Sequence, residues 1–491
     1  MLFNSLPYVI YLPLVFLGYW FVFNRNIKIQ NLFLIAVSYV FYAWWDWRFL
    51  GLILASSFVD YIAGQKITAA RSDASRKVFL WLSIFFNLSI LGLFKYYNFF
   101  VDSLLSLLGS LGYEATSVFT ISIILPIGIS FYTFQTMSYT IDVYNGKVKS
   151  ENNLLIFFAF VSFFPQLVAG PIERAARFLP QFKVARSFDL AKSIDGCRQI
   201  LWGFFKKVAI ADVLAVYVDQ IFIYQESLCG GLLLMGAIFF AIQIYCDFSG
   251  YSDIGIGTAK LFGFDLMDNF RTPYFSTSTT ELWRRWHISL GQWVNAYVFS
   301  VLALKYRRKL GKNGIVLAIL ITFLLIGLWH GANWTYVVFG LMQGMIVAVE
   351  YRAGGLFYRL MKHIPSFINK VLAWLITALI WLVCIVFFRS NSVSSAMSYL
   401  HKMLFVKKAY FQDILTQMET IEIIEILNSV SFLILPGILI FFIIEWKNRM
   451  FKHGLGNMMD NKILRYICYL TLLLIVVKFF FSEEAFIYFQ F

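Results

Sequence analysis

Long runs of apolar residues without Asp, Glu, Lys or Arg recur along the whole chain, and short polar segments separate them. A helix needs about 20 mostly apolar residues to cross the hydrocarbon core of a bilayer. The clearest runs occupy residues 7–23, 29–45, 78–94, 115–141, 152–172, 227–246, 371–388 and 426–444. Weaker candidates lie near residues 49–65, 198–222, 283–303 and 463–481. The pattern predicts an all-α, polytopic membrane protein with about 11–13 transmembrane helices, accompanied by re-entrant and interfacial helices.

The composition supports the same class. Of 491 residues, 60% are hydrophobic and 14% are charged, whereas roughly 25% of the residues in an average soluble domain are charged. The longest polar-leaning stretches, 173–198 and 389–425, are too short to fold alone. We therefore expect residues 1–491 to form a single integral membrane domain.

The formal net charge of +14 has two interpretations, nucleic-acid binding and the excess of Lys and Arg in the cytoplasmic loops of membrane proteins. The basic residues cluster between apolar runs, at 71–77, 305–312 and 447–452. This spacing favours the second interpretation, places these clusters on the cytoplasmic side and predicts no nucleic-acid partner. The basic segment 174–186 would lie outside if residues 152–172 crossed once, so we expect a re-entrant or surface-lying stretch nearby.

His330 lies within residues 313–349, which contain no charged residue. An ionisable side chain at membrane depth is unfavourable unless it faces a cavity or a partner, so His330 is a candidate functional residue. A bond to a neighbouring helix carbonyl is the alternative. The uncharged stretch is too long for one ordinary span, and Gly327 and Gly331 flank the histidine. We expect a broken helix here, with Asn333 and Thr335 satisfying freed backbone groups.

His287 ends the segment Glu-Leu-Trp-Arg-Arg-Trp-His at 281–287. One interpretation is an interfacial anchor, in which Trp lies at headgroup level and Arg extends to water. The other is a functional site, in which Arg284 and Arg285 face a polar cavity and bind a phosphate, a pyrophosphate or an acidic chain.

A third polar cluster, Tyr-Cys-Asp-Phe-Ser-Gly-Tyr-Ser-Asp-Ile-Gly-Ile-Gly, occupies residues 245–257. Its carboxylates and glycines predict a re-entrant or unwound segment rather than a continuous span. Asp247 and Asp253 either order Arg284 or Arg285, or they line a substrate path.

The sequence lacks the motifs of several enzyme classes. Its five cysteines have no metal or redox spacing, and it contains no Gly-x-Ser-x-Gly elbow, His-Glu-x-x-His pair or Walker loop. We therefore predict no metal site and no tightly bound cofactor, and the two histidines are left as the candidates for chemistry.

The polar blocks resemble the membrane-bound O-acyltransferases, in particular the bacterial branch with alginate O-acetyltransferase and the teichoic-acid D-alanylation protein. Four blocks in chain order carry the resemblance. They are Phe-Phe-Pro-Gln-Leu-Val-Ala-Gly-Pro-Ile at 163–172, the cluster at 245–257, Trp-Arg-Arg-Trp-His-Ile-Ser-Leu at 283–290 and Gly-Leu-Trp-His-Gly-Ala-Asn-Trp at 327–334. Residues 293–302 lack the Arg-Asp-Tyr and Ile-Pro-Leu-Gly-Gly segments of many relatives. This departure bears on the contact with the donor or a partner, and on neither histidine.

The resemblance implies helices around a central tunnel, and we expect a catalytic core over roughly 115–390 with peripheral helices over 1–114 and 391–491. It also implies a multi-pass protein of the bacterial cytoplasmic (inner) membrane. Its activity would move an acyl group, above all acetyl, from a cytoplasmic thioester donor to a hydroxyl of a cell-surface or secreted polysaccharide. The donor would be acetyl-coenzyme A or an acyl carrier protein, and a periplasmic or extracellular acetyltransferase partner is implied.

The resemblance makes His330 the catalytic histidine and His287 the second site histidine. We expect His330 to take the proton from the acceptor hydroxyl, and His287 or a neighbouring Arg or Asn to orient the substrate or stabilise the oxyanion. Direct transfer is favoured, and an acyl-histidine intermediate stays open. The expected substrate contacts are Arg284, Arg285, Asp247, Asp253, Asn333 and Trp329.

Two other functions stay open at this point. One is D-alanyl transfer to teichoic acid. The other is a polytopic transporter or scaffold for exopolysaccharide export, which would also combine many spans with intramembrane polar residues. The sequence shows no obvious internal repeat of the kind that many transporters have, which argues against transport.

Overall fold

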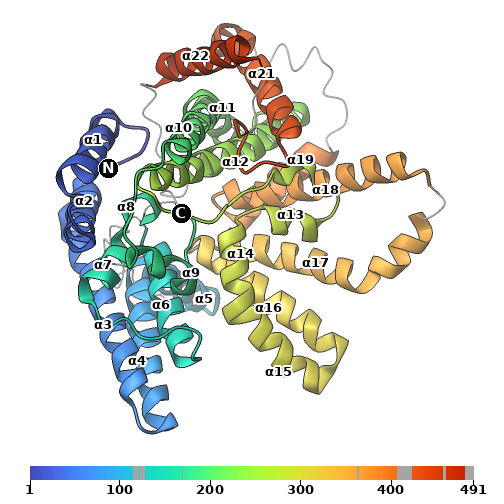
Figure 1. The fold of residues 1–491 in the computed structure, drawn as a ribbon. Coiled ribbons are helices and arrows are strands. Elements are labelled where there is room, and N and C mark those ends of the chain that lie inside the picture. The colour runs from blue at the N-terminus through green and yellow to red at the C-terminus, as the bar shows by residue number, and fades with distance from the viewer. Residues whose placement is uncertain are drawn as a thin grey trace. The chain divides into compact units, whose positions relative to one another are not determined.

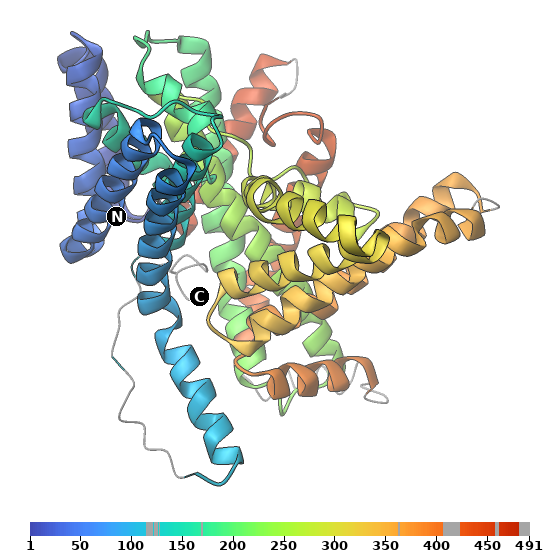
Figure 2. The same cartoon turned by 90° about the horizontal axis from the view of Figure 1, so that it is seen from below.

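The computed structural model describes residues 1–113, 128–167, 170–361, 364–405, 423–456 and 461–480, together with positions 121 and 126. Every regular element in these ranges is a helix (Figures 1 and 2). The chain belongs to the all-α class of polytopic membrane proteins, as its apolar runs predict.

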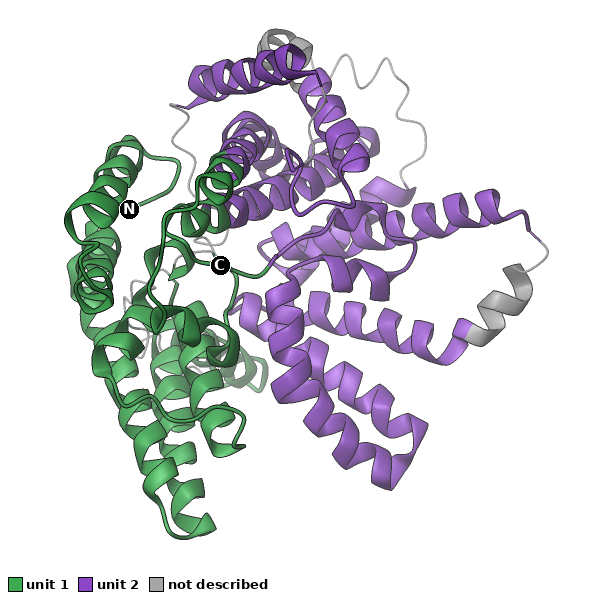
Figure 3. Ribbon diagram, viewed as in Figure 1, with its two compact units in different colours: residues 1–197, 255–267 green, residues 198–254, 268–491 purple. Residues whose placement is uncertain are grey.

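The backbone divides into two compact units (Figure 3). Unit 1 contains residues 1–197 and 255–267, and unit 2 contains residues 198–254 and 268–491. The predicted division into a catalytic core and peripheral helices concerns roles rather than packing, and it stays a prediction.

Unit 1 is built from the amino-terminal helices. They are α1 (Leu6–Leu17), α2 (Ile27–Asp46), α3 (Leu50–Ala69), α4 (Asp73–Leu91), α5 (Tyr97–Ser110), α6 (Ile129–Tyr144), α7 (Leu154–Ser162), α8 (Phe164–Leu167) and α9 (Ala175–Phe178). The apolar run 152–172 therefore forms two short helices, and α7 with 9 residues is less than half the length that a crossing needs. The expectation of a re-entrant or surface-lying stretch near residue 174 stays a prediction.

Unit 2 holds most of the remaining helices, and α10 and α12 each contribute residues to both units. The helices are α10 (Leu190–Phe204), α11 (Asp212–Ile223), α12 (Gly230–Leu261), α13 (Thr279–Arg285), α14 (Ile288–Val294), α15 (Ser300–Leu310), α16 (Lys312–His330), α17 (Trp334–Met361), α18 (Ser366–Arg389), α19 (Val393–Phe405), α21 (Ile423–Lys447) and α22 (Lys462–Phe479). Two π-helical turns, η5 (Phe205–Ala211) and η7 (Asn295–Phe299), continue α10 into α11 and α14 into α15.

Five stretches of helix are long and apolar enough to cross a membrane, counted over the ranges just given. They are Ile27–Ala69, Asp73–Ser110, Gly230–Leu261, Lys312–His330 and Ser366–Arg389. The predicted total of about 11–13 crossings includes shorter and broken helices, and that number stays a prediction.

The polar segment 245–257 lies inside α12, a continuous helix of 32 residues, so the prediction of an unwound or re-entrant segment is wrong. One reason is that its glycines serve close packing instead of a break. A Cβ added to Gly250 would lie 2.8 Å from the carbonyl oxygen of Gly203 in α10, and one added to Gly203 would lie 2.6 Å from the oxygen of Gly250. The two helix backbones therefore meet where a side chain would not fit.

Candidate active site

The uncharged stretch 313–349 forms a hairpin of two helices, α16 and α17, which lie side by side in Figures 1 and 2. Helix α16 ends at His330, and α17 begins at Trp334. The side-chain oxygen of Asn333 accepts a hydrogen bond of 3.0 Å from the backbone N–H of Thr335. The predicted helix break at His330 is therefore confirmed, and Asn333 satisfies a backbone donor at the start of the next helix.

His330 is 3% exposed and packs among aromatic side chains. Its ring centroid lies 5.1 Å from that of Phe388 and 6.2 Å from that of Phe339. It faces a small void of about 10 Å³, which is shared by Ile244, Trp283, Trp286, His330, Phe339, Trp381, Ile385 and Phe388. A void of this size holds about one water molecule.

His287 occupies the turn between α13 and α14. Its backbone is in the left-handed region, with φ 42° and ψ 55°, which is uncommon for a non-glycine residue and is found at functional sites. The backbone oxygen of Asn269 accepts from the N–H of Ile288 at 2.9 Å, and its side-chain oxygen accepts from Ser289 Oγ at 2.8 Å. Asn269 in turn donates to Ser252 Oγ on α12 at 3.0 Å. These bonds fix the chain immediately after His287.

Both histidine rings lie against the side chain of Trp329. The centroid of the Trp329 ring is 5.6 Å from that of His287 and 5.0 Å from that of His330. His287 is 1% exposed. Two titratable rings that are distant in sequence are thus brought together in a buried, aromatic environment, where they can exchange protons with a bound substrate.

Helix α13 carries the arginines and leads to His287. Its N-cap is Ser278, whose Oγ accepts from the N–H of Glu281 at 3.1 Å, while Glu281 Oε2 accepts from the N–H of Thr277 at 2.9 Å. The first bond is the N-cap bond of this helix, and the second holds Glu281 against the residue before the N-cap. Together they fix the start of a helix that has only 7 residues.

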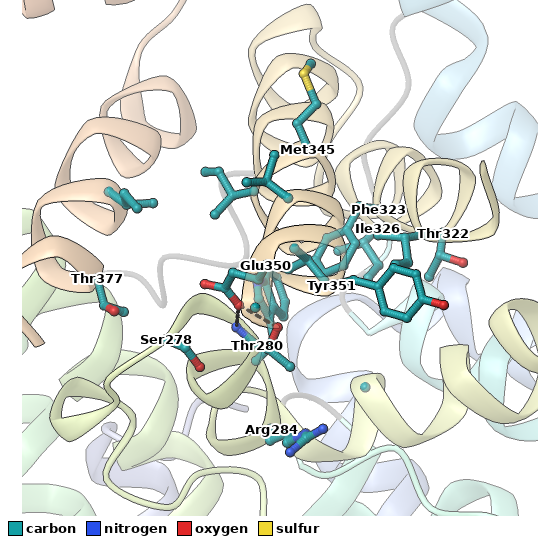
Figure 4. A pocket seen from close by; sticks show the side chains of 18 of the residues that line it. Ser278, Thr280, Arg284, Thr322, Phe323, Ile326, Met345, Glu350, Tyr351 and Thr377 are labelled. Atoms are coloured by element: carbon teal, nitrogen blue, oxygen red, sulfur yellow. Dashed lines mark hydrogen bonds between the residues drawn. The ribbon is translucent and has the colours of Figure 1, made fainter. Parts of the chain in front are cut away.

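A large cavity of about 1340 Å³ opens beside α13 (Figure 4). Its wall is mostly apolar and comes from α13, α14, η7, α16, α17 and α18. Arg284 and Glu350 are the charged residues among those that line it. Its α16 residues extend from Ile319 to Ile326, and Ile326 precedes His330 by about 6 Å along the helix axis. The cavity therefore lies on the Lys312 side of His330.

Trp283 lines both the large cavity and the small void beside His330. Its indole N–H donates to Gln343 Oε1 on α17 at 2.9 Å, and its ring packs edge-on against Phe323 at 5.1 Å.

The other residues predicted to contact the substrate lie in different environments. Arg284 is exposed and lines the cavity, whereas Arg285 pairs with Glu281 at 2.7 Å on its own helix. The side-chain amide of Asn333 also donates to the oxygen of Asn391 at 3.0 Å. A ligand-binding role for Arg284 stays a prediction.

Asp247 and Asp253 do not order the arginines, which corrects one of the two interpretations of the polar cluster. Lys207 lies 2.8 Å from Asp247, and Lys206 lies 2.5 Å from Asp253. Lys206 also donates to Ser249 Oγ at 2.9 Å. The two carboxylates thus join α12 to η5 through buried ion pairs, which explains how α12 stays helical through its polar segment. A role along a substrate path stays a prediction.

Sequence analysis missed three contributors to this site. Asn269 lies in an irregular segment without a motif, and Lys206 lies in an apolar run that was counted only as a weak span. Glu350 did carry a signal, since it is the residue that ends the uncharged stretch 313–349. The pattern Ser-x-x-Glu at 278–281 was also visible as the start of a helix.

Comparison with known proteins identifies the family. Residues 150–397 match the profile of MBOAT, the membrane-bound O-acyltransferase family. A probable alginate O-acetylase of Pseudomonas putida is 41% identical over 399 residues, which cover 81% of this chain and 79% of that protein. The chain belongs to the membrane-bound O-acyltransferase family. It is a multi-pass membrane O-acyltransferase, and the reaction requires an acyl donor.

Two other relatives show the range of acceptors that this family covers. The acyltransferase is 32% identical to a peptidoglycan O-acetyltransferase of Helicobacter pylori over 432 residues, with 82% of this chain and 80% of the relative aligned. It is 28% identical to a teichoic acid D-alanyltransferase of Bacillus subtilis over 229 residues, which are 45% of this chain and 58% of the relative.

Proposed function

We propose that this acyltransferase moves an acetyl group from a cytoplasmic thioester to a hydroxyl of a cell-surface or secreted polysaccharide. The observation that carries the proposal is the grouping of His330 and His287 around Trp329, beside a large cavity. Acetyl transfer is favoured over D-alanyl transfer because the O-acetylase aligns over 81% of the chain and the D-alanyltransferase over 45%. Transport or scaffolding would leave the paired histidines without a role.

The chemistry follows from histidine's ability to hold a proton near neutral pH. His330 takes the proton of the acceptor hydroxyl as its oxygen attacks the thioester carbonyl. The carbon–sulfur bond then breaks, and the proton on His330 passes to the leaving thiolate. His287 stabilises the oxyanion or orients the acceptor. The alternative route passes through an acyl-histidine intermediate, in which His330 carries the acyl group before it reaches the acceptor.

The donor would enter the cavity from the Lys312 side, which the positive-inside rule makes cytoplasmic. Arg284 is placed to bind a phosphate there. Both acetyl-coenzyme A and an acyl carrier protein present a phosphate and a pantetheine arm, so they share this chemistry. The mostly apolar wall would also keep water away from the thioester. The acetyl group would reach the polymer directly or through a periplasmic or extracellular acetyltransferase partner, and the setting would be the bacterial inner membrane.

Acyl transfer in purified membranes tests the proposal. Wild-type, His330→Ala and His287→Ala proteins would receive labelled acetyl-coenzyme A in one arm and a labelled acetyl carrier protein in the other. We expect His330→Ala to lose transfer by about 10²–10⁴-fold, as for removal of a general base. Folded His330→Ala protein that still transfers acetyl at the wild-type rate would contradict the assignment.

The acceptor is tested by comparing cells with and without the gene. We expect O-acetyl groups on the surface or secreted polysaccharide to disappear on deletion and to return with the wild-type copy but not with the His330→Ala copy. Unchanged acetylation of the polymer after deletion would overturn the polysaccharide assignment.

A further inference from the structure

The first turn of α13 depends on a carboxylate from another helix. Glu350 of α17 accepts hydrogen bonds from the backbone N–H groups of Thr279 at 2.7 Å and Thr280 at 2.8 Å. The hydroxyl of Thr280 donates to the same carboxylate at 2.6 Å. Figure 4 shows the Glu350 side chain reaching across the cavity wall to Thr280. One side chain therefore satisfies two of the four backbone donors that a helix start leaves free.

A charged acceptor suits this position better than a neutral one. The start of a helix carries a partial positive charge, and hydrogen bonds to a carboxylate are stronger than those to a neutral oxygen. Ser278 Oγ accepts from the backbone N–H of Glu281, while Glu350 accepts from those of Thr279 and Thr280. A helix of 7 residues is too short to be stable by itself, and its position is set by these contacts.

The hydrogen bonds from the start of α13 to Glu350, called the clamp below, connect the segments of the chain that carry the two histidines. Helix α17 starts at the turn that follows His330, and its Gln343 and Glu350 hold Trp283 and the start of α13 respectively. At the other end of α13 the chain turns directly into His287. A shift of α13 along α17 would thus move both Trp283 and His287 relative to His330.

We propose that Glu350 is a positioning residue, whose carboxylate fixes α13 and thereby places His287 and Trp283 against His330. The expected effect on the reaction rate rests on the proposed acyl transfer. The structural role of Glu350 at the start of α13 rests on the contacts alone. Glu350→Gln keeps one acceptor oxygen and sets an NH₂ group against a backbone donor. Glu350→Ala removes both acceptors. The effect should therefore rise from Gln to Ala.

The clamp is tested by hydrogen–deuterium exchange on the full-length protein in nanodiscs. We expect the peptide covering 279–285 to exchange at least 10-fold faster in Glu350→Ala, while peptides of α18 stay unchanged. Glu226→Gln is the matched control, since Glu226 is exposed and pairs with Lys402 on the same unit. Unchanged protection of 279–285 in Glu350→Ala overturns the clamp, whether or not the protein transfers acetyl.

The positioning role is tested by a double-mutant cycle on acyl transfer. We expect Glu350→Gln to lower kcat about 10- to 100-fold with little change in the KM for the donor, because small displacements of catalytic groups act on the chemical step. In a His287→Ala background the same change should lower kcat by a smaller factor, since the part of its effect that passes through His287 is absent. An equal loss in both backgrounds overturns the positioning role. A wild-type protein that transfers no acetyl group would instead overturn the proposed function. The hydrogen–deuterium exchange result would still decide whether Glu350 holds the start of α13.

Discussion

Lys207 shows how single residues hold charge in the interior of unit 2. Its ammonium lies 2.6 Å from Asp212 and 2.8 Å from Asp247, and the three side chains are 1–3% exposed. Breaking a buried ion pair leaves an uncompensated charge, at a cost of about 3–5 kcal/mol. We expect Lys207→Met to lower the stability of the detergent-solubilised protein by about that amount, measured as a fall in the thermal unfolding midpoint.

The control for Lys207 is Lys402→Met, because Lys402 pairs with an exposed carboxylate, that of Glu226. Exposed ion pairs contribute little, so this variant should unfold at nearly the wild-type temperature. Equal midpoints for the two variants would show that Lys207 is not needed to hold the two carboxylates.

Glu173 gives a prediction about pH. It lies in the turn after α8, where burial raises the pKa of its carboxyl to about 7 although Arg177 lies 3.1 Å away. Its pKa is thus higher in the folded than in the unfolded protein, so its contribution to stability is present below pH 4.5 and is lost as pH rises towards 7. We expect thermal stability to fall over this window in the wild type and less in Glu173→Gln. Parallel curves would contradict the prediction.

At this scale the sequence predicted residues that are conspicuous in their own segment. His330 and His287 stand out because a titratable ring is rare beside so many apolar residues. Lys207 and Asn269 do not stand out, because their importance depends on partners far along the chain. The pairing of Asp247 was misassigned for this reason. Arginines were visible nearby in sequence, and the lysine that binds it lies on another helix.

Among the helices, α16 and α17 depend on an unusually close crossing. A Cβ on Gly327 would lie 2.3 Å from the carbonyl oxygen of Tyr336, and one on Gly340 would lie 2.4 Å from that of Phe323. Backbone atoms on both sides leave no flexible side chain to move. The approach sets the position of His330 relative to α17.

We expect Gly327→Ala to force the two helices apart, to lower the unfolding midpoint and to reduce acyl transfer at least 10-fold, because a displacement of about 1 Å can reduce a rate 10²-fold. Gly51→Ala in α3 is the control, since a Cβ there meets nothing within 4 Å. Alanine favours a helix by about 1 kcal/mol over glycine, so this variant should be as stable as the wild type or more so. Wild-type activity in Gly327→Ala would exclude the packing argument.

A helix end could be predicted where the composition and length of an apolar stretch both indicated it. It could not be predicted where contacts with other helices decide whether a segment stays helical. The break at His330 followed from an uncharged stretch too long for one span. The continuity of α12 did not follow, because Asp247, Ser249 and Asp253 suggest an unwound segment until Lys206 and Lys207 are placed beside them. Polar residues on neighbouring helices that form hydrogen bonds or ion pairs with one another leave each helix intact. The spacing of polar residues within one segment of the sequence does not reveal such partners.

For the whole molecule, composition alone gave the all-helical membrane class. Hydrophobic runs follow from the thickness of the bilayer, so they are visible without any tertiary information. The division into two units was not visible, because α10 and α12 each belong to both and no linker marks the boundary. Sidedness follows from the distribution of Lys and Arg, which makes it open to a direct test.

We predict that the turn between α15 and α16 is cytoplasmic and that the turn after His330 lies towards the opposite side. Lys309 is exposed in the basic cluster, and Asn391 is exposed beside the α16–α17 turn, where its carbonyl accepts from Asn333. Each would be replaced by cysteine after Cys197, Cys229, Cys246, Cys384 and Cys468 are changed to alanine. A membrane-impermeant maleimide should label Lys309→Cys in inverted vesicles and Asn391→Cys in intact spheroplasts, and the cysteine-free protein in neither. Labelling of both positions from the same side would overturn this topology, because α16 could then not carry the site from the donor side to the acceptor side.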